Sequence, residues 1–142
     1  LARAYAGLLK REFALVDKHR VSSDLTQAGF VIGNVAGKRV LLVDDMIATG
    51  SSTAEAARAL KEKGALEVYV AATHAVFCGP AKERLAASPI RQLYVSDSIP
   101  VKDDYPELAD RTDVVSVAPL LGEAIRRIHE DESVSALFAR LG

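Results

Sequence analysis

The sequence predicts an α/β fold of three layers, in which a mostly parallel sheet carries helices on both faces. Short apolar runs alternate with helix-like segments along the whole chain, and strands separated by helices favour parallel pairing. A length of 142 residues is enough for one hydrophobic core but not for several domains. Residues 1–142 are therefore expected to form a single domain.

The first third of the chain predicts a helix followed by three strands. Apolar residues recur at helical spacing over residues 1–9, and the run "FALV" (residues 13–16) is typical of a buried strand. Residues 17–27 are polar and without periodicity, so they predict a long exposed loop, the kind of segment that often carries function. Residues 29–45 predict two strands joined at Ala36 and Gly37.

The rest of the chain continues the alternation of helices and strands. Residues 54–63 are rich in good helix formers, and Gly64 follows where a left-handed residue ends many helices. Beyond it we expect strands at residues 67–74, 91–95 and 113–117, helices at residues 79–87 and 118–131, and a loop over residues 96–112.

The composition excludes several classes of function. With 49% apolar residues, 26% charged residues and a net charge of -1, neither a disordered chain nor a nucleic-acid-binding protein is expected. No apolar run approaches the roughly 18 residues of a membrane span, so no membrane partner is expected. The single cysteine, Cys78, favours a reducing, cytoplasmic compartment, and the histidines and cysteine lack zinc-ligand spacing. No metal-binding residue is assigned.

The stretch "VDDMIATGSST" places two adjacent carboxylates after the apolar run "RVLLV". That run predicts a buried central strand, so Asp44 and Asp45 are expected at its carboxyl end, where open α/β sheets bind their ligands. Neighbouring side chains of an extended chain point to opposite sides, so one aspartate can face a ligand while the other holds the loop. Ribose hydroxyls or a hydrated Mg²⁺ are the natural partners.

The small residues that follow predict an anion site. Gly50 can adopt a positive φ in an exposed turn and present successive N–H groups to an anion, while Thr49 and Ser51 add hydroxyl donors. Ser52 and Glu55 fit a capping box that begins a helix and directs its positive end at the site. Together with the aspartates, this predicts a pocket for a phosphorylated pentose; a plain turn with good capping chemistry is the alternative.

The same stretch resembles the ribose-phosphate-binding motif of the type I phosphoribosyltransferase family. Four further segments, "ALVDKHR", "AATHAVFCGPAKERL", "LYVSDSIP" and "VAPLLGEAIRRIHEDESVSALF", narrow the resemblance to the ribose-phosphate pyrophosphokinase family. The resemblance implies that Lys18 and Arg20 lie on a catalytic loop. With the reading of the motif above, the residues expected to bind ribose 5-phosphate are Asp44, Asp45, Ala48, Thr49, Gly50, Ser51 and Ser52.

The resemblance also implies properties that the residues alone do not. The family transfers a pyrophosphoryl group from ATP to ribose 5-phosphate with Mg²⁺, and it forms homo-oligomers, commonly hexamers. Its chains are about twice as long, and this sequence resembles their second half, with the sugar-phosphate site and the catalytic loop. The main metal and nucleotide ligands are therefore expected outside this chain, which alone should be inactive.

Departures from the family pattern keep two alternatives open. Ala48 stands where the family often has Asp, Ser51 and Ser52 stand in place of Gly-Thr, and His19 replaces the middle Arg of Lys-Arg-Arg. One alternative is a salvage phosphoribosyltransferase, which would need a base-recognition segment. The other is a non-catalytic regulatory subunit, which Ala48 favours and the retention of Lys18 and Arg20 disfavours.

Overall fold

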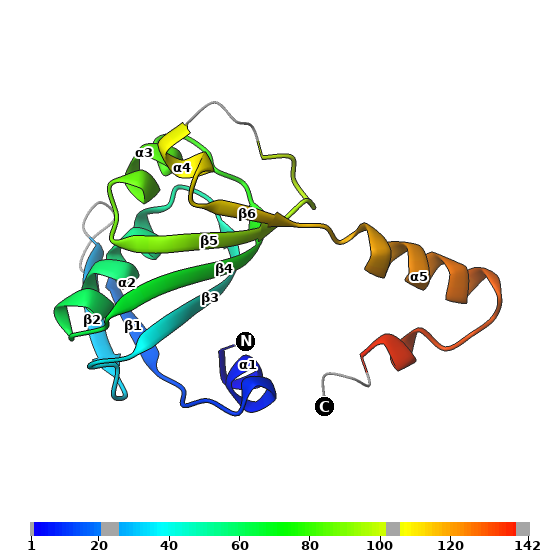
Figure 1. Ribbon diagram of the computed structural model, residues 1–142, viewed down its shortest axis with the longest axis horizontal. Helices are drawn as coiled ribbons and strands as arrows, with labels where there is room; N and C mark the ends of the chain where they lie inside the picture. Colours follow the sequence, from blue (N-terminus) through cyan, green and yellow to red (C-terminus); the bar gives the residue numbers. More distant parts are fainter. Residues whose placement is uncertain (1, 21–25, 102–105, 139–142) are drawn as a thin grey trace.

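Four parallel strands in the order β3-β4-β5-β6 form the central sheet of the computed structural model (Figure 1). The structure describes residues 2–20, 26–101 and 106–138, and only the backbone of residues 17–29 within these ranges. A separate antiparallel hairpin joins β1 to β2. The predicted α/β class, a mostly parallel sheet flanked by helices, is confirmed. The elements are α1 (Ala2–Leu9), β1 (Leu15–Arg20), β2 (Thr26–Ile32), β3 (Arg39–Ile47), α2 (Ser51–Glu62), β4 (Glu67–Ala75), α3 (Ala81–Ala86), β5 (Ile90–Ser96), α4 (Pro106–Ala109), β6 (Thr112–Val115), α5 (Ala118–His129) and η1 (Val134–Leu137).

The core lies between the central strands and two helices. Val68 and Val70 of β4 and Leu93 of β5 are fully buried, as are Leu60 of α2 and Leu85 of α3. Alternate residues of β4 share one face, so the buried valines define the face that the helices cover. Burial of each such side chain contributes about 1.5–3 kcal/mol, which fixes α2 and α3 against the sheet.

The end of α2 matches the prediction made for Gly64. This glycine has φ +87°, and its N–H donates to the Lys61 carbonyl while the Ala65 N–H donates to the Leu60 carbonyl. The two bonds together are the Schellman motif, which needs a left-handed residue at this position. The chain then turns directly into β4.

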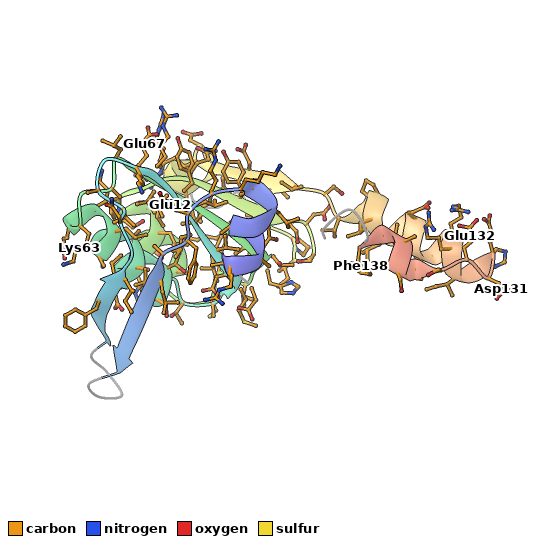
Figure 2. All side chains as sticks on the ribbon, turned by 90° about the horizontal axis from the view of Figure 1, so that it is seen from below. Glu12, Lys63, Glu67, Asp131, Glu132 and Phe138 are labelled. Atoms are coloured by element: carbon orange, nitrogen blue, oxygen red, sulfur yellow. The ribbon has the colours of Figure 1, made fainter. Side chains whose placement is uncertain are left out.

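The predicted loop over residues 17–27 is wrong for its described part. Lys18, His19 and Arg20 belong to β1 and pair with Ala28, Gln27 and Thr26 of β2. A two-stranded arm satisfies its backbone hydrogen bonds by pairing, so it needs no alternation of apolar residues, and its polar sequence gave no strand signal. Residues 21–25 lie outside the described residues. Figure 2 shows the hairpin projecting from the body of the molecule.

The predicted central strand is an edge strand. Within the central sheet β3 pairs only with β4, and Leu41 and Met46 are 42% and 48% exposed. The strand also continues to Ile47, so Asp44 and Asp45 lie inside it and not beyond its end. An apolar run cannot distinguish a central from an edge position, because strand order depends on contacts between distant segments.

Two smaller elements were not predicted. The short helix α4 falls inside the predicted loop over residues 96–112, where Leu108 is buried in the core. Residues 102–105 of that loop lie outside the described residues. The 3-10 helix η1 follows α5 near the end of the described chain. Both elements are four residues long, too short to show a helical repeat.

Helix α5 extends away from the sheet, and η1 folds back beside it (Figure 1). Glu132 and Phe138 lie on this projecting segment in Figure 2. Leu120, Leu121 and Ile125 of α5 are each more than half exposed. No described helix is long and apolar enough to cross a membrane.

The polar side of α5 carries a network of ion pairs. Arg126 pairs with Glu123, Glu130 and Glu132, and Arg127 pairs with Glu123 and Glu132. Hydrogen bonds from Arg126 are the main cause that lowers the pKa of Glu123 to about 2. All of these side chains are partly exposed, so solvent weakens each pair. The network nevertheless ties the end of α5 to the residues that precede η1.

We expect the Glu123 carboxylate to titrate near pH 2 in a side-chain NMR titration. Its folded pKa lies below the ordinary 4.5, so its stabilising contribution is complete above that value and is lost as the pH falls through about 2. Arg126→Gln should move the midpoint up toward 4.5, and Arg127→Gln, which removes a weaker cause, should move it less. A midpoint near 4.5 in the unchanged chain contradicts the network.

Candidate functional site

The two aspartates of β3 face different surroundings. Asp44 shares its side of the strand with Val40 and Leu42, which pack against the core, and it pairs in register with Ala72 of β4. The next residue, Asp45, is exposed. Its carboxylate accepts the Met46 N–H at 2.7 Å, and that of Asp44 accepts the Asp45 N–H at 3.0 Å. Each carboxylate thus accepts the N–H group of the residue that follows it.

Gly50 forms the turn between β3 and α2 and is buried against α3. Its φ of +72° is left-handed, and a Cβ there would lie 3.1 Å from the Ala81 carbonyl oxygen and 3.2 Å from the Leu85 side chain. The predicted positive φ is confirmed, but the expectation of an exposed turn is wrong. Only glycine combines this backbone conformation with so close an approach to α3.

Helix α2 begins two residues earlier than the proposed capping box requires. Its first residue is Ser51, its N-cap is Gly50, and no side chain caps it. The capping box of Ser52 and Glu55 is therefore wrong. A left-handed glycine has already turned the chain into the helix, so Ser52 lies within the first turn and not before it.

The four carbonyls of residues 47–50 are all bound by neighbouring elements. Those of Ile47 and Ala48 accept the N–H groups of Phe77 and Cys78, at 3.1 and 3.0 Å. The Thr49 carbonyl accepts Nη1 of Arg84 at 3.2 Å, and the Gly50 carbonyl accepts the Ala54 N–H at 2.9 Å. Each of these carbonyl oxygens therefore already accepts a hydrogen bond from within the protein.

The donors of the same turn are left open. The N–H groups of residues 49–53 donate to no other described residue, and the first N–H groups of any α-helix lack a partner inside the helix. The helix end adds the equivalent of roughly half a positive charge. Bound carbonyls, open N–H groups and a helix N-terminus together make the β3–α2 turn (residues 48–52) able to hold an anion.

Arg84 of α3 is a site residue that sequence reasoning missed. Besides the Thr49 carbonyl, its Nη1 donates to Ser51 Oγ at 2.7 Å. Ser51 Oγ also lies 3.4 Å from the Thr49 hydroxyl. Thirty-three residues separate Arg84 from Ser51, so no local pattern joins them. The available signal was weaker: helices that follow neighbouring parallel strands begin at the same edge of the sheet.

The loop after β5 lies beside the same edge. Ser96 and Ser98 both donate to the Thr73 carbonyl, and Ser98 Oγ is 2.9 Å from Nδ1 of His74. Farther along, the Asp97 carboxylate accepts the Ser116 hydroxyl and the Val117 N–H. These bonds, the hydroxyl first, lower the pKa of Asp97. The polar residues here serve to hold the ends of β4, β5 and α5.

A pocket of about 370 Å³ lies between α1, residues 11–16 and the open edge of β3. Asp44, Ser52 and Thr53 border it, whereas Asp45 and residues 48–51 do not. Most of its other lining is apolar, so it is unlike a phosphate site. Of the β3–α2 turn, only Ser52 lines the pocket. The chemistry of the turn identifies it as the stronger candidate site.

The remaining predicted site residues are placed only in part. Lys18 and Arg20 lie in β1, in a different sheet from the turn, and the structure describes only their backbone. Ala48, Thr49, Gly50, Ser51 and Ser52 form one continuous turn next to Asp44. The described residues contain no group of three or more His, Cys, Asp or Glu side chains suited to a metal ion.

The contact between Gly50 and α3 can be tested with a matched glycine. Gly37 has nearly the same φ, +69°, but nothing lies within 4 Å of a Cβ built there. Gly37→Ala should cost about 1–2 kcal/mol of unfolding free energy from backbone strain alone. Gly50→Ala should cost about 1–3 kcal/mol more, because the new methyl group meets α3. Urea unfolding measures both, and equal losses would contradict the close packing.

The chain matches a known family model and known proteins along most of its length. The model described as "Phosphoribosyl synthetase-associated domain" matches residues 20–139. A ribose-phosphate pyrophosphokinase of Caldanaerobacter subterraneus is 45% identical over 137 residues, which are 96% of this chain and 43% of the relative. One from a Nostoc species is 46% identical over 140 residues, with 96% of this chain and 41% of the relative covered.

A solved structure agrees with these matches. The crystal structure of phosphoribosylpyrophosphate synthetase from Mycobacterium smegmatis superposes with a TM-score of 0.77 at 34% identity, covering 92% of this chain and 42% of that one. The chain thus spans less than half the length of the proteins it matches. The family model covers far more than half of the chain. The proteins named above are similar to the chain in sequence, and the solved structure is similar in fold. The chain belongs to the phosphoribosyl synthetase-associated domain family and is similar along almost its whole length to ribose-phosphate pyrophosphokinases.

Proposed function

We propose that this chain supplies the ribose 5-phosphate site of a ribose-phosphate pyrophosphokinase and, on the β1–β2 hairpin, its catalytic residues Lys18 and Arg20. The observation that carries the proposal is the polarity of the β3–α2 turn, where every carbonyl is bound and the N–H groups are open. A phosphate group is an acceptor-only anion, so it complements this arrangement. The family supports the assignment, since the similar proteins are named for this reaction.

Binding of the sugar phosphate follows from the two ends of the site. The 5-phosphate lies against the N–H groups of residues 49–52, and the ribose hydroxyls donate to Asp44. A carboxylate in direct contact with a phosphate dianion would repel it, so Asp44 serves the sugar side. Asp45 diverges from the pocket and accepts the next N–H of its own chain, so its contribution is to hold the strand end.

In the reaction, the anomeric hydroxyl oxygen of ribose 5-phosphate forms a bond to the β-phosphorus of ATP. The bond from that phosphorus to the oxygen it shares with the α-phosphate breaks, AMP leaves with the electron pair, and the hydroxyl proton is released. Negative charge spreads over the transferred group and the leaving AMP. Lys18 and Arg20, closing over the substrates on the β1–β2 hairpin, are proposed to stabilise this charge.

Mg²⁺ is proposed to act with residues beyond those described. Magnesium sites of phosphate-transferring enzymes commonly use one or two carboxylates with waters and substrate phosphates. Asp44 meets that modest requirement, whereas the described residues hold no larger ligand cluster. When bound, the ion would neutralise phosphate charge. In the intact enzyme ATP, further metal ligands and a homo-oligomeric assembly complete the site.

A non-catalytic regulatory subunit is the second candidate, favoured by Ala48. The Ala48 carbonyl is bound by Cys78 whatever its side chain, so the turn can hold phosphate without the aspartate that the family often has. Phosphoribosyl pyrophosphate synthesis by the full-length protein distinguishes the two. Activity that is lost in Lys18→Ala identifies the enzyme, and binding of ribose 5-phosphate without turnover identifies the subunit.

Asp44→Ala should weaken binding of ribose 5-phosphate about tenfold, as expected when a hydrogen bond to a charged group is lost. It should leave the affinity for inorganic phosphate, measured without Mg²⁺, unchanged, because Asp44 lies on the sugar side of the site and does not contact the phosphate. Asp45→Ala is the matched control and should keep both affinities within about twofold. Calorimetric titration decides, and an equal effect of the two variants would show that the sugar does not lie at Asp44.

A protein of these 142 residues alone should synthesise no phosphoribosyl pyrophosphate from ATP and ribose 5-phosphate. The chain spans less than half of its relatives, and catalysis by positioning fails when one of two substrates is not oriented. Chromatographic separation of the nucleotides would detect any AMP formed. Turnover by the isolated chain would overturn the division of labour proposed here.

A further inference from the structure

Arg84 differs from the other partners of the β3–α2 turn because it binds the turn through a side chain. The carbonyls of Ile47, Ala48 and Gly50 are bound by backbone N–H groups, which any sequence could supply. Of these four carbonyls, only that of Thr49 is bound by a side chain of a described residue, Arg84. The same nitrogen of Arg84 also donates to Ser51 Oγ. One guanidinium therefore fixes the residues on both sides of Gly50.

The contact with Ser51 prevents its hydroxyl hydrogen from pointing toward Arg84. A guanidinium has only donors, so at 2.7 Å it must use a lone pair of Ser51 Oγ. The Ser51 hydroxyl hydrogen is then free to be donated elsewhere. A bound phosphate offers only acceptors, so it is the partner best suited to this hydrogen. The neighbouring open N–H groups also need an acceptor.

The position of Arg84 is set by the packing of α3. Ala81 and Leu85 are fully buried on the same helix, and both lie against Gly50. The rest of the helix can therefore place an exposed arginine beside the turn without burying its charge. Because Arg84 reaches the turn from the neighbouring crossover, any shift of α3 relative to α2 changes the turn directly.

We propose that Arg84 is a positioning residue, which holds the β3–α2 turn in its phosphate-binding form and makes the Ser51 hydroxyl a donor to the phosphate. The inference rests on the proposed phosphate site, but the tie between Arg84 and the turn exists without any ligand. The positioning role predicts that Arg84 acts through its two acceptors, the Thr49 carbonyl and Ser51 Oγ, and not merely through its charge.

The first experiment needs no ligand. Hydrogen exchange of the amides of Cys78 and Ala54, which donate to the Ala48 and Gly50 carbonyls of the turn, should become about tenfold faster in Arg84→Ala, because the turn opens locally when its side-chain tie is lost. Arg58→Ala is the matched control: Arg58 is an exposed arginine of α2 whose side chain makes no hydrogen bond or ion pair with a described residue, and its loss should leave these amides unchanged. Unchanged exchange in Arg84→Ala overturns the inference.

The second experiment measures affinity for ribose 5-phosphate by calorimetry on the full chain. Arg84→Ala should weaken it about fivefold to tenfold, and Arg84→Lys nearly as much, because a lysine keeps the charge but not the paired geometry. In a Ser51→Ala background the same substitution should cost clearly less, since one of its two acceptors is gone. Arg58→Ala should bind normally.

The outcomes separate this inference from the proposed function. Full affinity in Arg84→Lys with reduced affinity in Arg84→Ala would show that charge alone matters and would overturn the positioning role. Equal losses for Arg84→Ala with and without Ser51 would do the same. If the unchanged chain binds no ribose 5-phosphate, the proposed phosphate site is wrong, while the exchange experiment still decides whether Arg84 holds the turn.

Discussion

The functional geometry of this domain depends on the binding of every carbonyl between Ile47 and Gly50. Each backbone unit has one donor and one acceptor, and groups removed from water need partners. Here the acceptors find partners in the segment after β4, in α3 and in the first turn of α2. The donors consequently remain on the open side. In this turn of small residues, the carbonyls are therefore bound by the protein, and the N–H groups are available to a ligand.

The sheet and its helices supply the frame that this constraint requires. Val68, Val70 and Leu93 seat α2 and α3 on one face, so the two helices meet near the carboxyl ends of β3 and β4. Gly50 permits the turn to approach α3 within van der Waals contact. A larger residue would separate turn and helix, and the Arg84 tie would be lost together with the packing. Core burial and ligand geometry are therefore linked through one glycine.

Charge is distributed in the domain according to where each group acts. The described turn offers backbone donors, a helix N-terminus and one exposed arginine, while Asp44 stands apart on the preceding strand. Because the Asp44 carboxylate is separated from the donors of the turn, the site can bind a phosphate at the turn and sugar hydroxyls at Asp44. On the projecting α5, by contrast, Glu123 and Arg126 pair with each other at a distance from the turn, and their role is to hold the helix to the segment before η1.

The sequence by itself determined the α/β class, the alternation of strands and helices, and the motif on which the site is built, because these follow from local periodicity and residue type. Gly50 and Gly64 were predictable for the same reason, since their left-handed conformations are required within a few residues of chain. The edge position of β3, the polar β1–β2 hairpin and the start of α2 at Ser51 depended on pairing and packing between distant segments. The contact between Arg84 and Ser51 was decided only by the tertiary structure, because two crossovers of the sheet had to place α3 beside α2 before an arginine on one helix could reach a serine on the other.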